Sequence, residues 1–129
     1  MVTLFFDRSV GRRLPEALLS LKLPITIHYH QQHFSPAEQD DIWLPQVGDW
    51  EWFVIGQDWS YHLQAPELSA IKQYGIGCFY LWGSEAPVWE TMRCFARAYD
   101  NILMAANHHP RPFIFRVSRT GSLRAVPIP

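Results

Sequence analysis

Short runs of apolar residues recur along the chain, and most of them are followed by a stretch with helical spacing. The run Val2–Phe6 is continuous rather than alternating, which is typical of a strand buried on both faces of a sheet. Because such strands belong to parallel sheets, the pattern predicts a central parallel sheet with helices between its strands. The runs cover residues 2–6, 25–29, 52–56, 76–82 and 113–117.

Helix signals fill the segments between the runs. Ser35, Pro36 and Glu38 form a capping box with proline at the first helical position, so we expect a helix to begin there. Pro45 is expected to end or kink that helix, because proline lacks the N–H that a helix interior needs. The other helices are expected over residues 12–22, 66–74 and 87–106.

The order of these elements predicts an α/β fold, specifically a three-layer α/β/α sandwich with a mainly parallel central sheet. Thr120-Gly121-Ser122 can turn the last run back into a C-terminal hairpin with residues 123–128. No repeat or linker interrupts the pattern, so we expect residues 1–129 to form a single domain.

Apolar residues at helical spacing are expected to face the sheet in the longest helix. They are Trp89, Met92, Ala96, Tyr99 and Leu103. Trp43, Trp52 and Trp82 lie on the faces of other elements and are also expected in the core.

Charge is distributed unevenly, although the net charge is only −1 and the apolar fraction of 48% allows a packed core. No acidic residue follows Asp100, whereas several arginines do. These arginines either follow nucleic-acid phosphates or are solvated on an edge hairpin, and the sequence leaves both interpretations open. They are Arg111, Arg116, Arg119 and Arg124.

Other patterns narrow the class of protein. No apolar run reaches the length of about 18 residues that a membrane span needs, and no signal-peptide pattern is visible. We therefore expect a cytoplasmic protein without membrane contact. Cys78 and Cys94 lack metal-type spacing, so both are expected as buried free thiols.

Acidic residues stand where the predicted strands end. Asp7 directly follows the first run and Asp58 the third, while Asp40 and Asp41 fall in the opening turns of a helix and Glu67 opens another. The carboxyl ends of parallel strands share one edge, where such sheets gather their ligands, so these side chains are expected to lie near one another. Each of them also suits a helix start or a turn by itself, which is the structural alternative.

Oxygen ligands favour Mg²⁺ or Mn²⁺ over zinc. We expect Asp7 and Asp58 to bind the metal directly, and Asp40 to bind it directly or through water, with Asp41 as its rival. Glu67 is expected to support the outer shell of ligands or a second metal. Such a metal can activate water and clamp phosphate oxygens, so the predicted catalytic set of Asp7, Asp40, Asp58 and Glu67 points to phosphodiester hydrolysis.

Several short motifs occur in an order that is informative when they are taken together. They are Phe5-Phe6-Asp7-Arg8-Ser9-Val10, Asp40-Asp41-Ile42-Trp43-Leu44-Pro45, Trp52-Phe53-Val54-Ile55-Gly56-Gln57-Asp58, and Pro66-Glu67-Leu68 followed by Ala70. In this order they resemble the PIN-like domains related to VapC toxins. The resemblance covers residues 2–82 and leaves the last third of the chain without a counterpart.

The resemblance implies a metal-dependent ribonuclease, often the toxin half of a toxin–antitoxin pair, with RNA as substrate and an antitoxin protein as partner. Asp7, Asp40 and Asp58 match the acidic positions of that pattern, and Asp40 fits it better than Asp41. PIN domains usually carry a further acidic residue soon after the third strand, and residues 59–62 include none. This departure supports an alternative, a catalytically depleted domain that binds RNA or a protein.

Other interpretations concern basic residues. Arg8 and Arg12 are expected to meet the scissile phosphate, or else to face solvent. His28, His30 and His33 could hold zinc, but we expect them to line the same edge as the carboxylates. A receiver-like signalling domain also holds Mg²⁺ at strand ends, yet it fits this chain less well. The last hairpin could pair with a second copy of the chain, giving a homo-oligomer.

Overall fold

The computed structural model describes residues 1–57 and 65–128, whose strands form one six-stranded sheet. The strand order is β2-β1-β3-β4-β5-β6; the first five strands run parallel, and β6 pairs antiparallel with β5. The bounds are β1 (Thr3–Phe6), β2 (Thr26–Tyr29), β3 (Phe53–Gly56), β4 (Gly77–Leu81), β5 (Phe113–Val117) and β6 (Leu123–Ala125). The predicted strands and the C-terminal hairpin are therefore confirmed.

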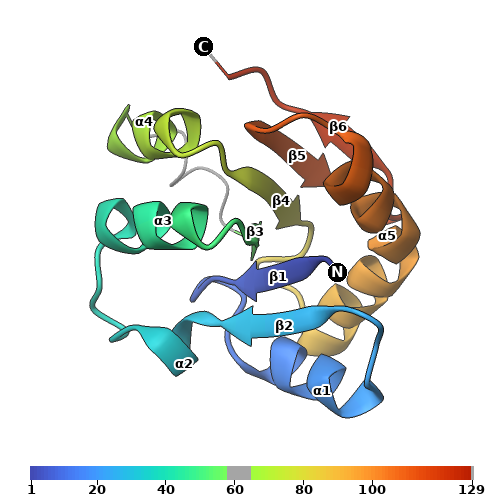
Figure 1. Cartoon of the computed structure of the whole chain (residues 1–129). Helices are drawn as coiled ribbons and strands as arrows, with labels where there is room; N and C mark the ends of the chain where they lie inside the picture. Colours follow the sequence, from blue (N-terminus) through green and yellow to red (C-terminus); the bar gives the residue numbers. More distant parts are fainter. Residues whose placement is uncertain (58–64, 129) are drawn as a thin grey trace.

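Helices cover both faces of this sheet, as Figure 1 shows. On one side lie α1 and α5, and on the other α3 and α4. The bounds are α1 (Arg13–Leu21), α2 (His30–His33), α3 (Asp40–Asp49), α4 (Ala65–Gln73) and α5 (Val88–His108). This is the three-layer α/β/α sandwich that the element order predicts.

The core is divided by the sheet into two clusters because side chains alternate along each strand. Leu4 and Phe6 of β1 face α1 and α5, whereas Phe5 faces α3. All three residues are fully buried. Burial on both faces explains why this run is continuously apolar.

One crossover differs in hand from the others. The connections β3–α4–β4 and β4–α5–β5 each move the chain one strand in the same direction, yet α4 and α5 lie on opposite faces. Parallel crossovers nearly always share one hand, so the β4–α5–β5 connection departs from the usual rule. Consequently, among the described helices, α3 and α4 cover the β1–β4 part of their face and none covers the carboxyl end of β5 and the adjacent start of β6.

The start of α3 differs from the prediction. The capping box at Ser35 does not open the helix, which begins at Asp40 with Gln39 as its N-cap. The carbonyls of Pro36 and Glu38 instead accept hydrogen bonds from the guanidinium of Arg8, so these residues are held outside the helix. Pro45 also lies within α3 rather than ending it.

The predicted stripe of α5 is displaced from the buried one. The residues that face the sheet are Thr91, Cys94, Phe95, Ala98 and Ile102. Trp89 is 66% exposed and Trp82 is 37% exposed, so the prediction that both lie in the core is wrong. Thr, Cys and Ala at the buried positions allow close packing on the sheet, which a stripe chosen by size alone overlooks.

The remaining expectations concern thiols and membranes. Cys78 and Cys94 are buried free thiols, as predicted. None of the described helices combines the length and the hydrophobicity that a bilayer crossing requires.

Candidate functional site

The topology of the sheet marks one place on its carboxyl edge. From β1 the chain proceeds to β2 on one side, and later to β3 on the other, so β1 and β3 flank the point at which the strand order reverses. Open α/β sheets bind ligands outside the strand ends at such a point. Asp7 and Gln57 directly follow these two strands. Asp58 lies outside the described residues.

Asp7 is a buried carboxylate, with only 4% of its surface exposed. Its Oδ1 accepts hydrogen bonds from the backbone N–H of Ser9, at 2.8 Å, and from the Ser9 hydroxyl. The Ser9 Oγ in turn accepts the backbone N–H of Gln57, at 3.0 Å. Ser9 therefore ties the end of β1 to the end of β3.

The second oxygen of Asp7 lies over Gly56, a residue without a side chain. A Cβ at Gly56 would be 2.8 Å from Asp7 Oδ2 and 2.8 Å from Cε1 of Tyr80. Neither distance is compatible with an ordinary contact. The glycine is thus required for the carboxylate and the Tyr80 ring to approach the same point of the sheet.

The charge of Asp7 also influences its neighbours below the edge. Burial is the main cause that raises the pKa of the Cys78 thiol, and the negative charge of Asp7 is the second. Cys78 therefore stays protonated and is a packing residue rather than a nucleophile.

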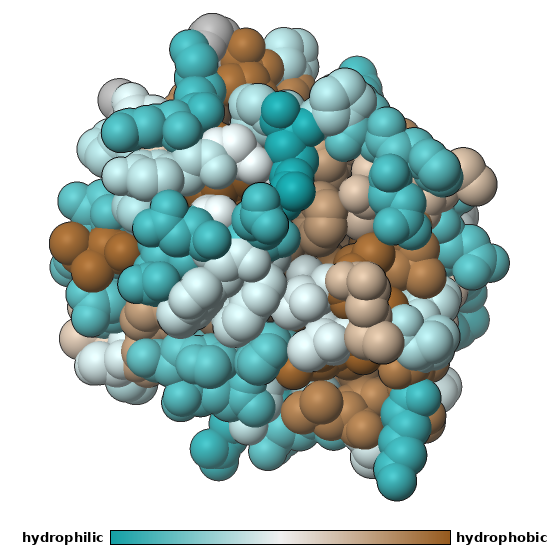
Figure 2. All heavy atoms as spheres, viewed as in Figure 1, coloured by the Kyte–Doolittle hydropathy of each residue, from teal (hydrophilic) through white to brown (hydrophobic). Residues whose placement is uncertain are grey.

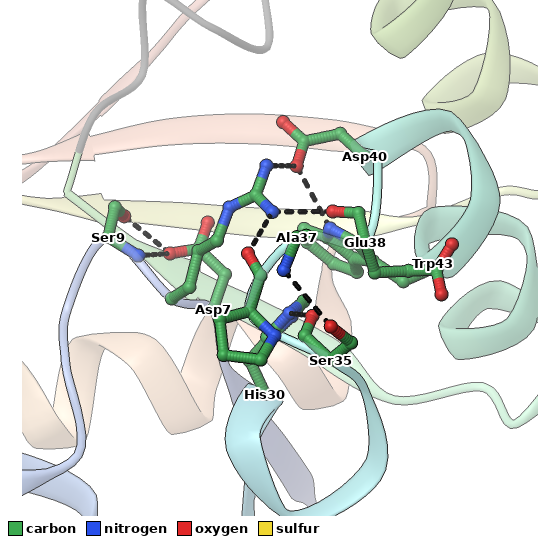
Figure 3. Close-up of polar contacts among 10 residues, drawn as sticks. Asp7, Ser9, His30, Ser35, Ala37, Glu38, Asp40 and Trp43 are labelled. Atoms are coloured by element: carbon green, nitrogen blue, oxygen red, sulfur yellow. Dashed lines mark hydrogen bonds and ion pairs between the residues drawn. The ribbon is translucent and has the colours of Figure 1, made fainter.

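Arg8 holds a neighbouring segment of backbone in place through bonds to Glu38 and Asp40, both of which are labelled in Figure 3. Its Nη1 donates to the carbonyls of Pro36, at 2.9 Å, and of Glu38. Its Nη2 lies 3.1 Å from Asp40 Oδ1, which also accepts the indole N–H of Trp43 at 2.9 Å. Arg8 and Asp40 are thus brought together as an ion pair next to a fully buried tryptophan. We call this group, Arg8 with residues 35–43, the clamp.

Asp40 and its predicted rival differ in surroundings. The Asp40 side chain is 11% exposed, whereas Asp41 is exposed at the first turn of α3. Behind the clamp, the buried His30 contacts the carbonyl oxygen of Ser35 through Nε2, at 3.0 Å. His30 therefore supports the clamp from the inside.

Arg12 and Glu67 lie at helix starts. Arg12 is the N-cap of α1, has a 70% exposed side chain and lies 3.7 Å from Glu16. Glu67 is in the first turn of α4, and its Oε2 is buried with no hydrogen-bond partner in the described part of the chain. An unsatisfied buried oxygen calls for an explanation, and a cation is one that fits its chemistry.

The described residues supply only part of a metal site. Within residues 1–57 and 65–128, no three side chains of His, Cys, Asp or Glu gather closely enough to hold an ion. The donor chemistry nevertheless suits a hard cation, since Asp7 Oδ2 stands over the space left by Gly56 and Glu67 Oε2 is buried. Asp58, the remaining predicted ligand at the switch point, is outside the described ranges.

The histidines after β2 separate into two environments. His28 Nδ1 and His33 Nε2 are 3.0 Å apart, and the His28 ring stacks on Trp52 with centroids 4.1 Å apart. Burial chiefly, and then the charge of His33, lower the pKa of His28. His30 points into the core, so the H-x-H-x-x-H pattern does not bring three rings together.

Sequence reasoning missed the residues that hold Asp7 in position. Ser9 stands two residues after the aspartate, a spacing that allows an Asp side chain to bond the backbone ahead of it. Gly56 shows no signal in the sequence, because its role appears only when β1 and β3 are paired. Gln57 also anchors the edge to α5, since its Nε2 donates to Thr91 Oγ1 at 3.2 Å.

Comparison with known proteins gives one match. A family model described as PIN like domain matches residues 2–83, which include β1 to β4. Neither a curated protein nor a solved structure matches the chain.

Proposed function

Because the chain belongs to the PIN-like domain family, a family of nucleases, we propose that it hydrolyses RNA with Mg²⁺ or Mn²⁺ as cofactor. The observation that carries this proposal is the buried Asp7 carboxylate at the switch point of the sheet. Ser9 fixes one of its oxygens, and Gly56 leaves room above the sheet for the other.

The metal would be held by Asp7 and Asp58, with Glu67 beside them and Asp40 reaching it through water. When bound, it would supply an activated water and charge stabilisation at the phosphate. The protein contributes orientation, because Ser9 prevents the Asp7 carboxylate from rotating. It also contributes burial, since a carboxylate that is 4% exposed loses little of its attraction to solvent screening.

We further propose that the nuclease is the cytoplasmic toxin of a toxin–antitoxin pair. Induced expression in a bacterial host is then expected to arrest growth, and Asp7→Asn should abolish the arrest. Co-expression of the product of the adjacent gene should restore growth to the wild-type protein. Growth arrest that is equal for wild type and Asp7→Asn would contradict a toxic nuclease.

A second candidate function is a depleted domain that binds RNA or a protein without cleaving. The clamp favours this candidate. Arg8 and Trp43 both donate to Asp40 Oδ1, on a carboxylate that the nuclease proposal assigns to the metal. The lack of an acidic residue at positions 59–62 points the same way.

A cleavage assay separates the two candidates. Purified protein is incubated with single-stranded and structured RNA, with Mn²⁺ or with a chelator, beside Asp7→Asn and Asp58→Asn. Asp49→Asn is the matched control, since it removes an exposed carboxylate at the opposite end of α3. The nuclease proposal expects metal-dependent cleavage that both site variants lose and the control retains. RNA binding without cleavage in the wild type supports the depleted domain.

A further inference from the structure

Most of the buried polar side chains belong to one set of hydrogen bonds. The face drawn in Figure 2 is largely hydrophilic, so polar residues are readily accommodated at the surface. Among the described residues, four polar or charged ones are buried, namely Asp7, His30, Gln57 and Thr91. His30 supports the clamp, whereas the other three are connected through Ser9. We call the bonds from Thr91 through Gln57 and Ser9 to Asp7 the network.

The network begins at α5, where the direction of its bonds is fixed. Thr91 Oγ1 lies 3.3 Å from the carbonyl oxygen of Gly83, which can only accept, so the hydroxyl donates there. The hydroxyl oxygen in turn accepts a hydrogen bond from Gln57 Nε2, at 3.2 Å. The amide of Gln57 is therefore held with its nitrogen toward α5.

The network continues from the backbone of Gln57 to Asp7. The Gln57 N–H donates to Ser9 Oγ at 3.0 Å, and the hydroxyl and N–H of Ser9 both donate to Asp7 Oδ1, as Figure 3 shows. Gln57 immediately precedes Asp58 in the sequence. Of the two carboxylates proposed as direct metal ligands, one accepts the last bonds of the network and the other is the next residue after Gln57.

The hydroxyl of Thr91 is not needed to fill space. Thr91 faces the sheet from α5 together with Cys94 and Phe95, and a valine would have nearly the same shape. A buried hydroxyl costs free energy unless it is bonded, and apolar groups of the same shape can replace a bonded pair with little change in stability. A fully bonded network, however, specifies one arrangement of its members. The threonine therefore indicates orientation of Gln57 rather than packing.

Gly83 brings the loop after β4 close to the network. Its φ is +102°, and a Cβ at this position would be 3.3 Å from Thr91 Oγ1. Gly83 and Gln57 also line a cleft of about 590 Å³ over the carboxyl ends of β4 and β5, together with Glu85 and three arginines. The network thus runs beside this cleft, at the edge of the sheet that carries Asp7.

We propose that Thr91 and Gln57 are positioning residues of the metal site, which act on Asp7 through Ser9. This inference rests on the proposed function. The proposed ligands all lie within residues 2–83, which match the family model, whereas Thr91 lies outside that segment. In this role α5 completes the site from a part of the chain that the family model does not cover. Bonds that hold metal ligands in place typically contribute about 10- to 100-fold to metal affinity or activity.

Two substitutions of Thr91 separate orientation from packing. Thr91→Val keeps the shape and removes the hydroxyl, whereas Thr91→Ser keeps the hydroxyl and removes a methyl group. Each should lower the melting temperature by about 4 °C, for different reasons. A threonine with a merely structural role would therefore make both variants lose function equally.

The first readout needs neither metal nor RNA. Hydrogen exchange of the Ser9 and Gln57 backbone N–H groups is measured by NMR. Because both groups donate within the network, their exchange should be about tenfold faster in Thr91→Val and unchanged in Thr91→Ser. The N–H of Asp7, which is bonded to the Ile55 carbonyl, is the internal control and should stay protected in both variants. Wild-type exchange in Thr91→Val would overturn the inference.

The second readout is the metal. Mn²⁺ binding is measured by electron paramagnetic resonance without RNA, and the Mn²⁺ dependence of cleavage is measured in single turnovers. Thr91→Val should weaken binding and raise the half-saturating Mn²⁺ concentration by about tenfold, and Thr91→Ser should stay within about twofold of wild type. Equal losses in the two variants, or faster exchange in Thr91→Val with unchanged Mn²⁺ binding, would contradict a role in the metal site.

A double-mutant cycle tests the route through Gln57. Gln57→Met removes the same bond from the other side and should raise the half-saturating Mn²⁺ concentration by a similar factor. The Thr91→Val, Gln57→Met double variant should then lose no more than the worse single variant, because both changes remove one interaction. Losses that multiply would mean that Thr91 does not act through Gln57.

The outcome is independent of the nuclease test. If the wild type neither binds Mn²⁺ nor cleaves RNA, but exchange at Ser9 and Gln57 responds to Thr91→Val alone, the proposed nuclease function fails and the positioning of Asp7 stands. If the wild type cleaves RNA and Thr91→Val behaves like Thr91→Ser, only the positioning inference fails.

Discussion

Around Arg8 the polar groups at the sheet edge bond to one another, whereas beyond Tyr80 three arginines and Glu85 line an open cleft. In the clamp, one guanidinium meets two carbonyls and a carboxylate. In the cleft, Arg116 and Arg124 stand opposite each other. Both regions lie on the same edge and contain residues suited to binding. The bonds of the clamp hold the fold, the cleft is open at the surface, and Asp7 lies between the two regions.

The substitution with the largest expected effect is at Gly56, which lies between the two regions. Gly56→Ala places a methyl group 2.8 Å from Asp7 Oδ2 and 2.8 Å from the Tyr80 ring. Because a displacement of about 1 Å in a reacting group can cost about 100-fold in rate, cleavage should fall by about that factor. Single-turnover kinetics measure the rate, and calorimetry should show a loss of about 1–3 kcal/mol from overpacking. Unaltered cleavage would mean that Asp7 takes no part in it.

A substitution inside the clamp should instead lower stability and leave cleavage nearly unchanged. Trp43→Phe removes the donor to Asp40 Oδ1 and leaves a void beside Phe5, whose ring centroid is 5.4 Å from that of Trp43. The free energy of unfolding should fall by about 2 kcal/mol. Denaturant unfolding measures this, while cleavage per folded molecule should stay near wild type. A large loss of cleavage without loss of stability would mean that the bond from Trp43 is needed to position Asp40 for the metal.

Substitution of Arg8, whose guanidinium belongs to the clamp, should have a smaller effect on stability. Arg8→Ala should lower stability by about 1 kcal/mol, since its side chain is 38% exposed and solvent weakens its bonds. Arg12→Ala removes an arginine that is 70% exposed and should change stability by less than about 0.5 kcal/mol. RNA binding in chelator should be unaffected by Arg8→Ala. Weaker binding with intact stability would assign Arg8 to the substrate.

The smallest expected effect is the pH dependence of stability that arises from His28 and its neighbour His33. The pKa of His28 is lowered, so the unfolded chain binds more protons than the folded one as the pH falls from about 7 to about 5. Stability is therefore present above the usual histidine pKa and is lost as the pH falls through the folded value. His33→Gln removes the neighbouring charge and should flatten this dependence, whereas His108→Gln, at the exposed end of α5, should not. Thermal unfolding at several pH values measures it.

Much of the fold was readable from the sequence because it depends on local pattern. Short apolar runs identified β1 to β5. The start of α3 was wrong because Arg8, far away in sequence, takes the carbonyls that a helix would need. The register of α5 was wrong because small residues, rather than tryptophan, face the sheet.

The site was readable only where its residues follow strand ends. Asp7 was found by that rule, and the structure locates it at the switch point. The environment of Asp40 was not readable, because its bonds come from Arg8 across the edge and from Trp43 one turn later. The network from Thr91 to Asp7 depends on bonds between residues that lie far apart in the sequence, which no local pattern reveals.

The match to the family model ends at residue 83, shortly after β4, and the hairpin of β5 and β6 comes after it. The turn of this hairpin leans on α5, since a Cβ at Gly121 would be 2.6 Å from the Arg97 carbonyl carbon. Asp7 therefore lies inside the segment that matches the family model, whereas Arg116 and Arg124 lie outside it. Evolution, or a protein engineer, can therefore rewrite the sequence of β6 while leaving the surroundings of Asp7 as they are.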